Sequence, residues 1–183
     1  MGPERDGRDD GPWPGRAAVA ARLFVLSAAL LTAVGALGQA IGWTTLTSTL
    51  GPTAYLVLVH PDSVTARVRN AVLGHGAALA CALACLAGFD LWDHPPVTVS
   101  NEAPWPRIGA QSLAVGGTLV LLTLLRAHHP PAAATALLVA SGISRPGPPL
   151  YGLLVGLVLT VVLAPALARL PPFRSRTARE HAP

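Results

Sequence analysis

The chain has 183 residues, 51% hydrophobic and 12% charged, with a mean hydropathy of +0.50 and a formal net charge of +4. A disordered chain needs few apolar residues and much charge, so this composition excludes that class. A soluble globular domain is also excluded, because stretches such as 23–61 and 147–168 contain no charged residue and cannot cover a protein surface. The sequence therefore predicts a membrane protein.

The basic residues and the cysteines exclude further classes. All 13 basic residues are arginines, and since basic tails of membrane proteins usually reflect topology, we expect no nucleic-acid partner. Cys81 and Cys85 lie inside an apolar run, so we expect no disulfide framework, metal site or cofactor. The apolar run that begins at residue 17 is too long for a cleaved signal sequence, so we expect a retained first helix.

Four apolar runs are long enough to cross a bilayer as helices, which takes about 20 residues each. In chain order they are 17–43, 70–92, 108–126 and 148–170. Trp43 and Trp105 stand where interfacial aromatic residues are common. We therefore expect an all-α, polytopic membrane protein, with residues 17–170 as its transmembrane domain and disordered tails at 1–16 and 171–183.

Two further segments, 44–60 and 127–143, are uncharged apart from histidines, but prolines interrupt both. Proline cannot continue a helix from the preceding turn, whereas it suits the first turn of a new helix. Each segment is therefore predicted to be an irregular lead-in followed by a short helix, which starts near Pro52 or near Pro130.

The two broken segments resemble each other. Residues 53–57 (TAYLV) and 135–139 (TALLV) align at an offset of 82 residues, and the same offset relates the end of the first span to that of the third. Because the order of elements also matches, we expect two repeats, at about 17–92 and 107–170.

Each broken segment is long enough to cross the membrane, although it could also turn back. If both cross, eleven arginines lie inside and two, Arg107 and Arg145, lie outside; if both turn back, the division is nine to four. The positive-inside rule favours crossing, and both arrangements place the termini in the cytoplasm. The Ala-, Gly- and Arg-rich composition is typical of a GC-rich bacterial genome, so we expect a bacterial inner-membrane protein.

Crossing would make the repeats inverted, because three elements per repeat start the second copy from the opposite side. Inverted repeats of secondary transporters form a midplane site from two broken helices. The N-termini of such helices carry unpaired N–H groups and partial positive charge, which favour an anion. If the segments turn back, the repeats are parallel and this argument weakens.

Several short motifs resemble those of the HPP family of integral membrane proteins in order and spacing. They are residues 125–138 (LRAHHPPAAATALL), Gly51-Pro52-Thr53-Ala54, and the pairs Arg69-Asn70 and Gly74-His75. The resemblance covers about residues 20–170. It implies a small membrane protein that acts as a transporter, and some plant and cyanobacterial members are linked to nitrite transport.

Two positions depart from the family pattern. Ala133 stands where glycine is usual, and Arg67-Val68 replaces a common Gln-Pro before the Arg-Asn pair. These departures bear on the start of the second short helix and on the loop before the second span. A second tripeptide, His94-Pro95-Pro96, lies in a polar loop without a Thr-Ala-Leu run behind it and is not part of the motif.

The candidate substrate-binding residues come from these motifs. They are Gly51, Pro52, Thr53, Arg69, Asn70, His75, His129, Pro130, Pro131 and Thr135. His129 could neutralise an anion, relay a proton or cap its helix, because an unpaired intramembrane histidine is costly. His75 could contact the ligand or only pack, the threonines could cap the short helices, and Arg69 could guide anions or set topology.

Transport of a small anion, with nitrite as the most specific candidate, is the function that these features favour. We expect no enzyme, because no Asp or Glu lies inside a span and the histidines lack a metal-ligand spacing. A membrane scaffold or sensor without transport is the alternative. Apart from the lipid bilayer and the anion, a homo-oligomer is the partner to consider. The small-residue pairs Gly38/Gly42 and Gly152/Gly156 predict either an oligomer or tight internal packing.

Overall fold

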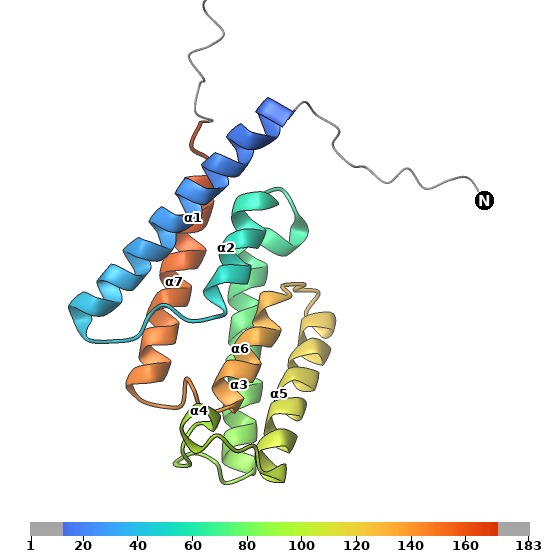
Figure 1. Cartoon of the computed structure of the whole chain (residues 1–183). Coiled ribbons are helices and arrows are strands. Elements are labelled where there is room, and N and C mark those ends of the chain that lie inside the picture. The colour runs from blue at the N-terminus through green and yellow to red at the C-terminus, as the bar shows by residue number, and fades with distance from the viewer. Residues whose placement is uncertain (1–12, 172–183) are drawn as a thin grey trace, which may run out of the picture.

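The structure is a computed structural model that describes residues 13–171, and within that range it contains helices and no strands. The helices are α1 (Trp13–Ile41), α2 (Leu50–Val59), the 3₁₀ helix η1 (Val64–Ala66), α3 (Val68–Gly88), α4 (Val97–Ser100), α5 (Trp105–Leu124), α6 (Pro131–Ala140) and α7 (Pro148–Ala168). They form one bundle, with α4 at one end and with the start of α1 and the end of α7 at the other (Figure 1).

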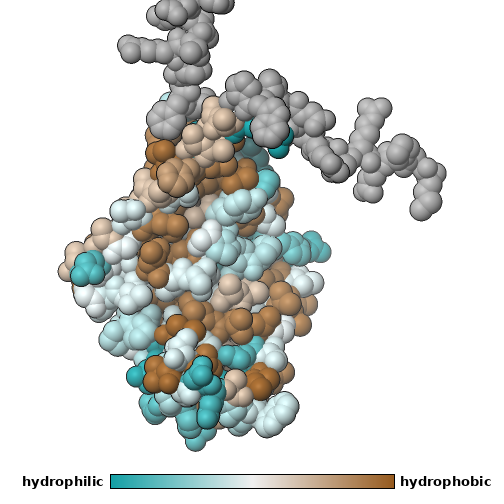
Figure 2. Space-filling view, viewed as in Figure 1, coloured by the Kyte–Doolittle hydropathy of each residue, from teal (hydrophilic) through white to brown (hydrophobic). Residues whose placement is uncertain are grey.

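Four of these helices, α1, α3, α5 and α7, are long and apolar enough to cross a membrane. Figure 2 shows apolar side chains over the flank of the bundle and many hydrophilic ones at the end where α4 lies. Large apolar side chains such as Phe24 and Leu124, each 73% exposed, cover the outside of the helices and suit contact with lipid. The predicted all-α, multi-pass membrane fold is confirmed.

The two proline-broken segments form the short helices α2 and α6. α2 begins at Leu50 and α6 at Pro131, close to the prolines that predicted them. α1 begins at Trp13, earlier than expected, because the last four residues of the predicted tail 1–16 form the first turn of the helix, where Pro14 is well suited. The remainder of both predicted tails lies outside the described residues.

The helices pack in two groups. α3 packs on α5 and α6, whereas α7 packs on α1 and α2, and the two groups meet where α2 touches α6 and where α3 touches α7. In Figure 1, α2 runs upward and α6 runs downward from neighbouring starting points inside the bundle. The first turns of both short helices therefore lie at its centre.

Glycines allow the extended segment 43–46, which leads into α2, to lie directly against its neighbours. α1 ends at Ile41, and the next residue, Gly42, has a φ of +74°, the left-handed conformation common after a helix. A Cβ added at Gly38, Gly152 or Gly156 would collide with segment 43–46. These glycines therefore serve packing within one chain, which was one of the two roles predicted for the small-residue pairs.

Candidate functional site

The buried centre of the bundle holds a cluster of polar side chains from α2, α3, α6 and the residues that lead into the short helices. Its members are the hydroxyl groups of Thr49, Thr53 and Thr135 and the imidazoles of His75 and His129, which we call the polar cluster. His75 is 4% exposed and the other four are 0% exposed. Because an unpaired polar group in an apolar interior is costly, the hydrogen bonds of these side chains decide what the cluster can do.

The two histidines of the cluster touch each other. Their Nε2 atoms lie 3.2 Å apart, and their rings meet edge to face at 73° with centroids 4.9 Å apart. α3 carries His75, and His129 lies just before α6. Gly74 makes this approach possible, because a Cβ there would lie only 3.0 Å from the Cβ of His129. The Gly-His pair of the sequence therefore acts as one packing unit.

A backbone carbonyl fixes the ring of His129. Its Nδ1 lies 2.9 Å from the carbonyl oxygen of Thr65 in η1. Since a carbonyl can only accept, Nδ1 carries a hydrogen and donates it. Asn70 holds η1 in place, because its Nδ2 donates to the carbonyl of Val64 at 2.8 Å. The asparagine of the Arg-Asn pair thus positions the acceptor for His129.

The threonines join the histidines to α2. The hydroxyl of Thr135 lies 2.9 Å from Nδ1 of His75 and 2.7 Å from the hydroxyl of Thr49. The Thr49 hydroxyl also lies 3.3 Å from the carbonyl of Pro131, to which it can donate. Thr53 donates to the carbonyl of Thr49 at 2.9 Å and lies 3.4 Å from Nε2 of His75. The first turns of α2 and α6 therefore meet at one buried point.

The N-terminal amides of the short helices are less free than expected from the sequence. The N–H groups of Ala132 and Ala133 donate to carbonyls of the preceding turn, at 3.0 and 3.1 Å, and Leu50 does the same at the start of α2, at 3.1 Å. No side chain caps either N-terminus, so the threonines are not caps. The groups that remain for a ligand are therefore imidazoles and hydroxyls, next to the partial positive charge of two helix starts.

The structure brings together four of the residues predicted as a site, namely Thr53, His75, His129 and Thr135. Pro131 is buried beside them and contributes its carbonyl. Gly51, Pro52, Arg69 and Pro130 are exposed. The guanidinium of Arg69 donates to its neighbour Asn70 at 3.4 Å, away from the histidines.

Two buried polar residues matter although the sequence does not single them out. The one feature of the sequence that could have indicated Thr49 is its offset of 82 residues from Pro131, whose carbonyl it contacts. Arg107, expected as an outside arginine, is 2% exposed. Its guanidinium donates to the carbonyl of Ala140 at 3.3 Å and to that of Pro95 at 3.1 Å, which ties α5 to the last turn of α6. No pattern near Trp105 indicated this burial.

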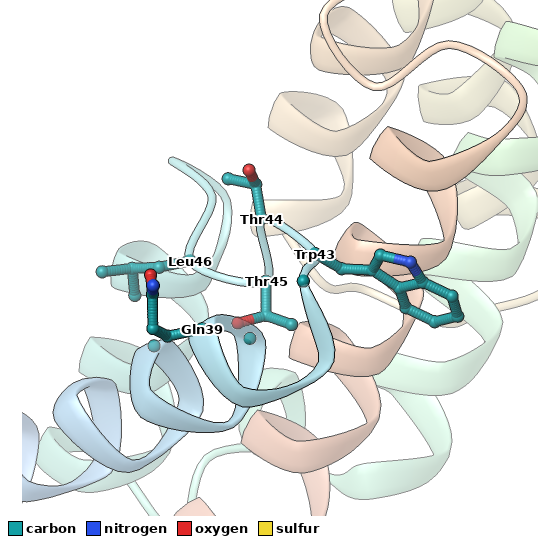
Figure 3. Close-up of a pocket in the computed structure, with 8 residues that line it drawn as sticks. Gln39, Trp43, Thr44, Thr45 and Leu46 are labelled. Atoms are coloured by element: carbon teal, nitrogen blue, oxygen red, sulfur yellow. The ribbon is translucent and has the colours of Figure 1, made fainter.

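Cavities reach the surface outside the polar cluster. One of about 500 Å³ lies where α1 passes into α2, lined by segment 43–46, Gln39 and glycines of α1. Figure 3 shows Trp43 at this place directed toward α7, where its ring centroid lies 5.7 Å from that of Tyr151. Another of about 420 Å³ lies between the end of α2 and the end of α7, and Arg67 and Arg169 are among its lining residues.

A comparison with known families identifies a transmembrane region. The family model described as "HPP, transmembrane region" matches residues 13–177. That range includes both groups of helices and all members of the polar cluster. No curated protein and no solved structure matches the chain.

Proposed function

The chain belongs to the HPP transmembrane family, and on this basis we propose that it transports a small inorganic anion, such as nitrite, across the membrane. The binding site in this proposal is the polar cluster at the first turns of α2 and α6. Both termini would lie in the cytoplasm of a bacterial cell, as the arginine distribution favours.

The observation that carries the proposal is the buried meeting of two imidazoles and three hydroxyls inside apolar helices. These groups can donate hydrogen bonds to a small anion, and the positive ends of the α2 and α6 dipoles add to its stabilisation. No Asp or Glu lies on α2, α3, α5, α6 or α7, so a cation would find no carboxylate in these helices.

We also propose that α1–α3 and α5–α7 are inverted repeats. Exchanging the two groups preserves which helices touch, because α3 contacts α5 and α6 as α7 contacts α1 and α2, although the group of α3, α5 and α6 is packed more closely. Residue contacts follow the same exchange. A Cβ at Gly74 would lie 3.2 Å from Ala132, and a Cβ at Gly156 would lie 3.1 Å from Leu50. The offset of 82 residues relates Gly74 to Gly156 and Leu50 to Ala132, so the two contacts correspond.

The relation between the repeats supports a mechanism of alternating access. Thr49 and Pro131, also 82 residues apart, contact each other and would lie on the axis between the repeats. The polar cluster is closed to solvent in this conformation. Movement of α1, α2 and α7 against α3, α5 and α6 would open it to one side of the membrane at a time.

An uptake assay tests the proposal. Vesicles that contain the purified full-length chain should take up nitrite faster than empty vesicles at alkaline pH, where little membrane-permeable nitrous acid exists. His129→Ala should abolish this difference, whereas His128→Ala, at an exposed position, should retain it. If folded protein takes up nitrite, nitrate and chloride no faster than empty vesicles, transport is wrong and the scaffold or sensor alternative stands.

A further inference from the structure

We propose that the polar cluster binds one proton together with the anion, so that the protein is a proton–anion symporter. This inference rests on the proposed anion transport and adds its coupling ion. It follows from a continuous chain of hydrogen-bonding groups that runs between two backbone carbonyls.

This relay chain has five contacts. In order, they join Thr65 O to His129 Nδ1 (2.9 Å), His129 Nε2 to His75 Nε2 (3.2 Å), His75 Nδ1 to Thr135 Oγ1 (2.9 Å), Thr135 Oγ1 to Thr49 Oγ1 (2.7 Å), and Thr49 Oγ1 to Pro131 O (3.3 Å). Each contact needs one hydrogen between its two atoms.

The neutral relay chain is one hydrogen short. Each neutral imidazole supplies one hydrogen and each hydroxyl supplies one, which gives four hydrogens for the five contacts. Both ends are carbonyl oxygens, which supply none. One added proton therefore fills these five contacts, and Thr53, whose hydroxyl lies 3.4 Å from Nε2 of His75, already donates its own hydrogen to the carbonyl of Thr49.

The position of the missing hydrogen follows from the fixed end at Thr65. In the neutral chain, His129 donates to Thr65, His75 donates from Nε2 to His129, Thr135 donates to His75, and Thr49 donates to Thr135. The carbonyl of Pro131 then receives no hydrogen from Thr49. With these donor directions, each of the four contacts other than that between Thr49 and Pro131 holds one hydrogen.

Adding a proton reverses the chain without breaking it. His129 keeps its bond to Thr65 and gains a hydrogen on Nε2, which it donates to Nε2 of His75. His75 now carries its hydrogen on Nδ1 and donates it to Thr135, which donates to Thr49, which donates to Pro131. Only N–H and O–H hydrogens move, and the imidazole pair gains one positive charge.

Among the described residues, no carboxylate hydrogen-bonds to either histidine, and Asp62, in the loop between α2 and η1, is exposed. The helices and turn that pack around the histidines are α2, η1, α5, α6 and α7, and they carry no carboxylate. Their ionisable side chains are Tyr55, which is exposed, Tyr151 beside Trp43, and Arg107 at the far end of α5, bound to carbonyls. α3 itself adds Arg69, Cys81 and Cys85, and none of these hydrogen-bonds to the relay chain in the described residues.

The absence of a counter-charge couples the proton to the anion. A buried charge without a partner is costly, so the protonated chain is unfavourable alone, and a buried anion is unfavourable beside the neutral chain. When both bind, each offsets the cost of the other. Thermodynamic linkage then requires that the anion raises the affinity for the proton by the same factor as the proton raises that for the anion.

The proton site takes one histidine from each proposed repeat, His75 from α3 and His129 from the lead-in to α6, and its symmetry-related counterpart lacks both. The offset of 82 residues relates His75 to Leu157, which is buried, and relates His129 to Thr47, whose hydroxyl has no hydrogen-bond partner within residues 13–171. The symmetry-related site therefore has no imidazole at either place. One chain is expected to bind one proton for each anion, which makes transport of a monovalent anion electroneutral.

A proton-uptake measurement tests the coupling. Purified full-length protein in weakly buffered detergent solution receives sodium nitrite, while a dye reports pH and calorimetry reports anion binding. At alkaline pH we expect uptake of about one proton per bound anion, and an apparent Kd that falls about tenfold for each unit fall in pH. His75→Gln should lose the proton uptake, and His128→Gln should keep it.

The outcomes separate this inference from the proposed function. Nitrite binding without proton uptake in the wild type overturns symport and leaves anion transport standing. No binding by folded protein, together with no uptake in vesicles, overturns both. Since His75→Gln could misfold, ¹⁵N NMR of labelled histidine in the wild type gives a second measurement. Both nitrogens of one imidazole should be protonated with nitrite bound, and a spectrum with two neutral rings would contradict the proposal.

Discussion

The hydroxyl of Thr135 connects α3 to α2 through a single oxygen atom. It contacts Nδ1 of His75 at 2.9 Å and the hydroxyl of Thr49 at 2.7 Å, and the residue is 0% exposed. Valine has nearly the same shape but lacks the hydroxyl, so the substitution removes both contacts without leaving a cavity. The effect of Thr135→Val therefore measures hydrogen bonding at the centre of the molecule.

We expect Thr135→Val to lower the free energy of unfolding by about 1–3 kcal/mol, because it leaves two buried polar atoms without this partner. Anion uptake should fall strongly as well. Thr123→Val is the matched control, since the Thr123 hydroxyl is exposed and donates within its own helix to Leu119 at 2.8 Å. Denaturant unfolding in detergent and vesicle uptake measure the two effects, and equal stability losses in both variants would contradict this account of the cluster.

Arg107 acts at the scale of elements, because it holds three segments together. α5 carries it, and its guanidinium donates to Ala140 at the end of α6 and to Pro95 in the loop before α4. A positive charge at the C-terminus of a helix is favourable, and so is a charged hydrogen bond to the carbonyl of Ala140, which is buried, whereas Pro95 is exposed.

Arg107→Met keeps most of the side-chain volume but removes the charge and both hydrogen bonds. We expect a loss of about 2 kcal/mol in unfolding free energy and faster hydrogen exchange in α4 and at the end of α6. Arg145→Met is the control, because Arg145 is exposed near the same end of α6. If the unfolding free energy of Arg107→Met falls while hydrogen exchange in α6 is unchanged, Arg107 does not hold this helix end.

The existence and starts of the short helices could be predicted from the sequence, because proline constrains the backbone locally. Pro52 and Pro130 forbid one continuous helix, and α2 and α6 begin within two residues of them. The partners of the cluster could not be predicted in the same way. The contact of His129 with His75 and with Thr65 depends on how α3 and α6 pack, and no local pattern encodes that packing.

At the scale of the whole molecule, the proposed repeats matter most where they differ. The shared glycines shape both groups of helices alike, whereas histidines stand in only one of them. The sequence offset could indicate the repeat but not that His75 and His129, one from each proposed repeat, meet at one buried site. The residues related to them by the offset, Leu157 and Thr47, form no second imidazole pair.

The orientation of the bundle in the membrane gives the last prediction. Asp62 and Glu102 are both exposed, and they lie in connections at opposite ends of α3. In a chain whose Cys81 and Cys85 are replaced by alanine, we expect Glu102→Cys to react with an impermeant maleimide added to intact cells. Asp62→Cys should react only after permeabilisation.

If both broken segments turned back, α3 would be inverted and the two labelling patterns would exchange, although the termini would stay in the cytoplasm. The reversed pattern would thus remove the inverted repeat, and with it the midplane placement of the polar cluster, whereas the expected pattern requires α2 with its lead-in to complete a crossing between α1 and α3.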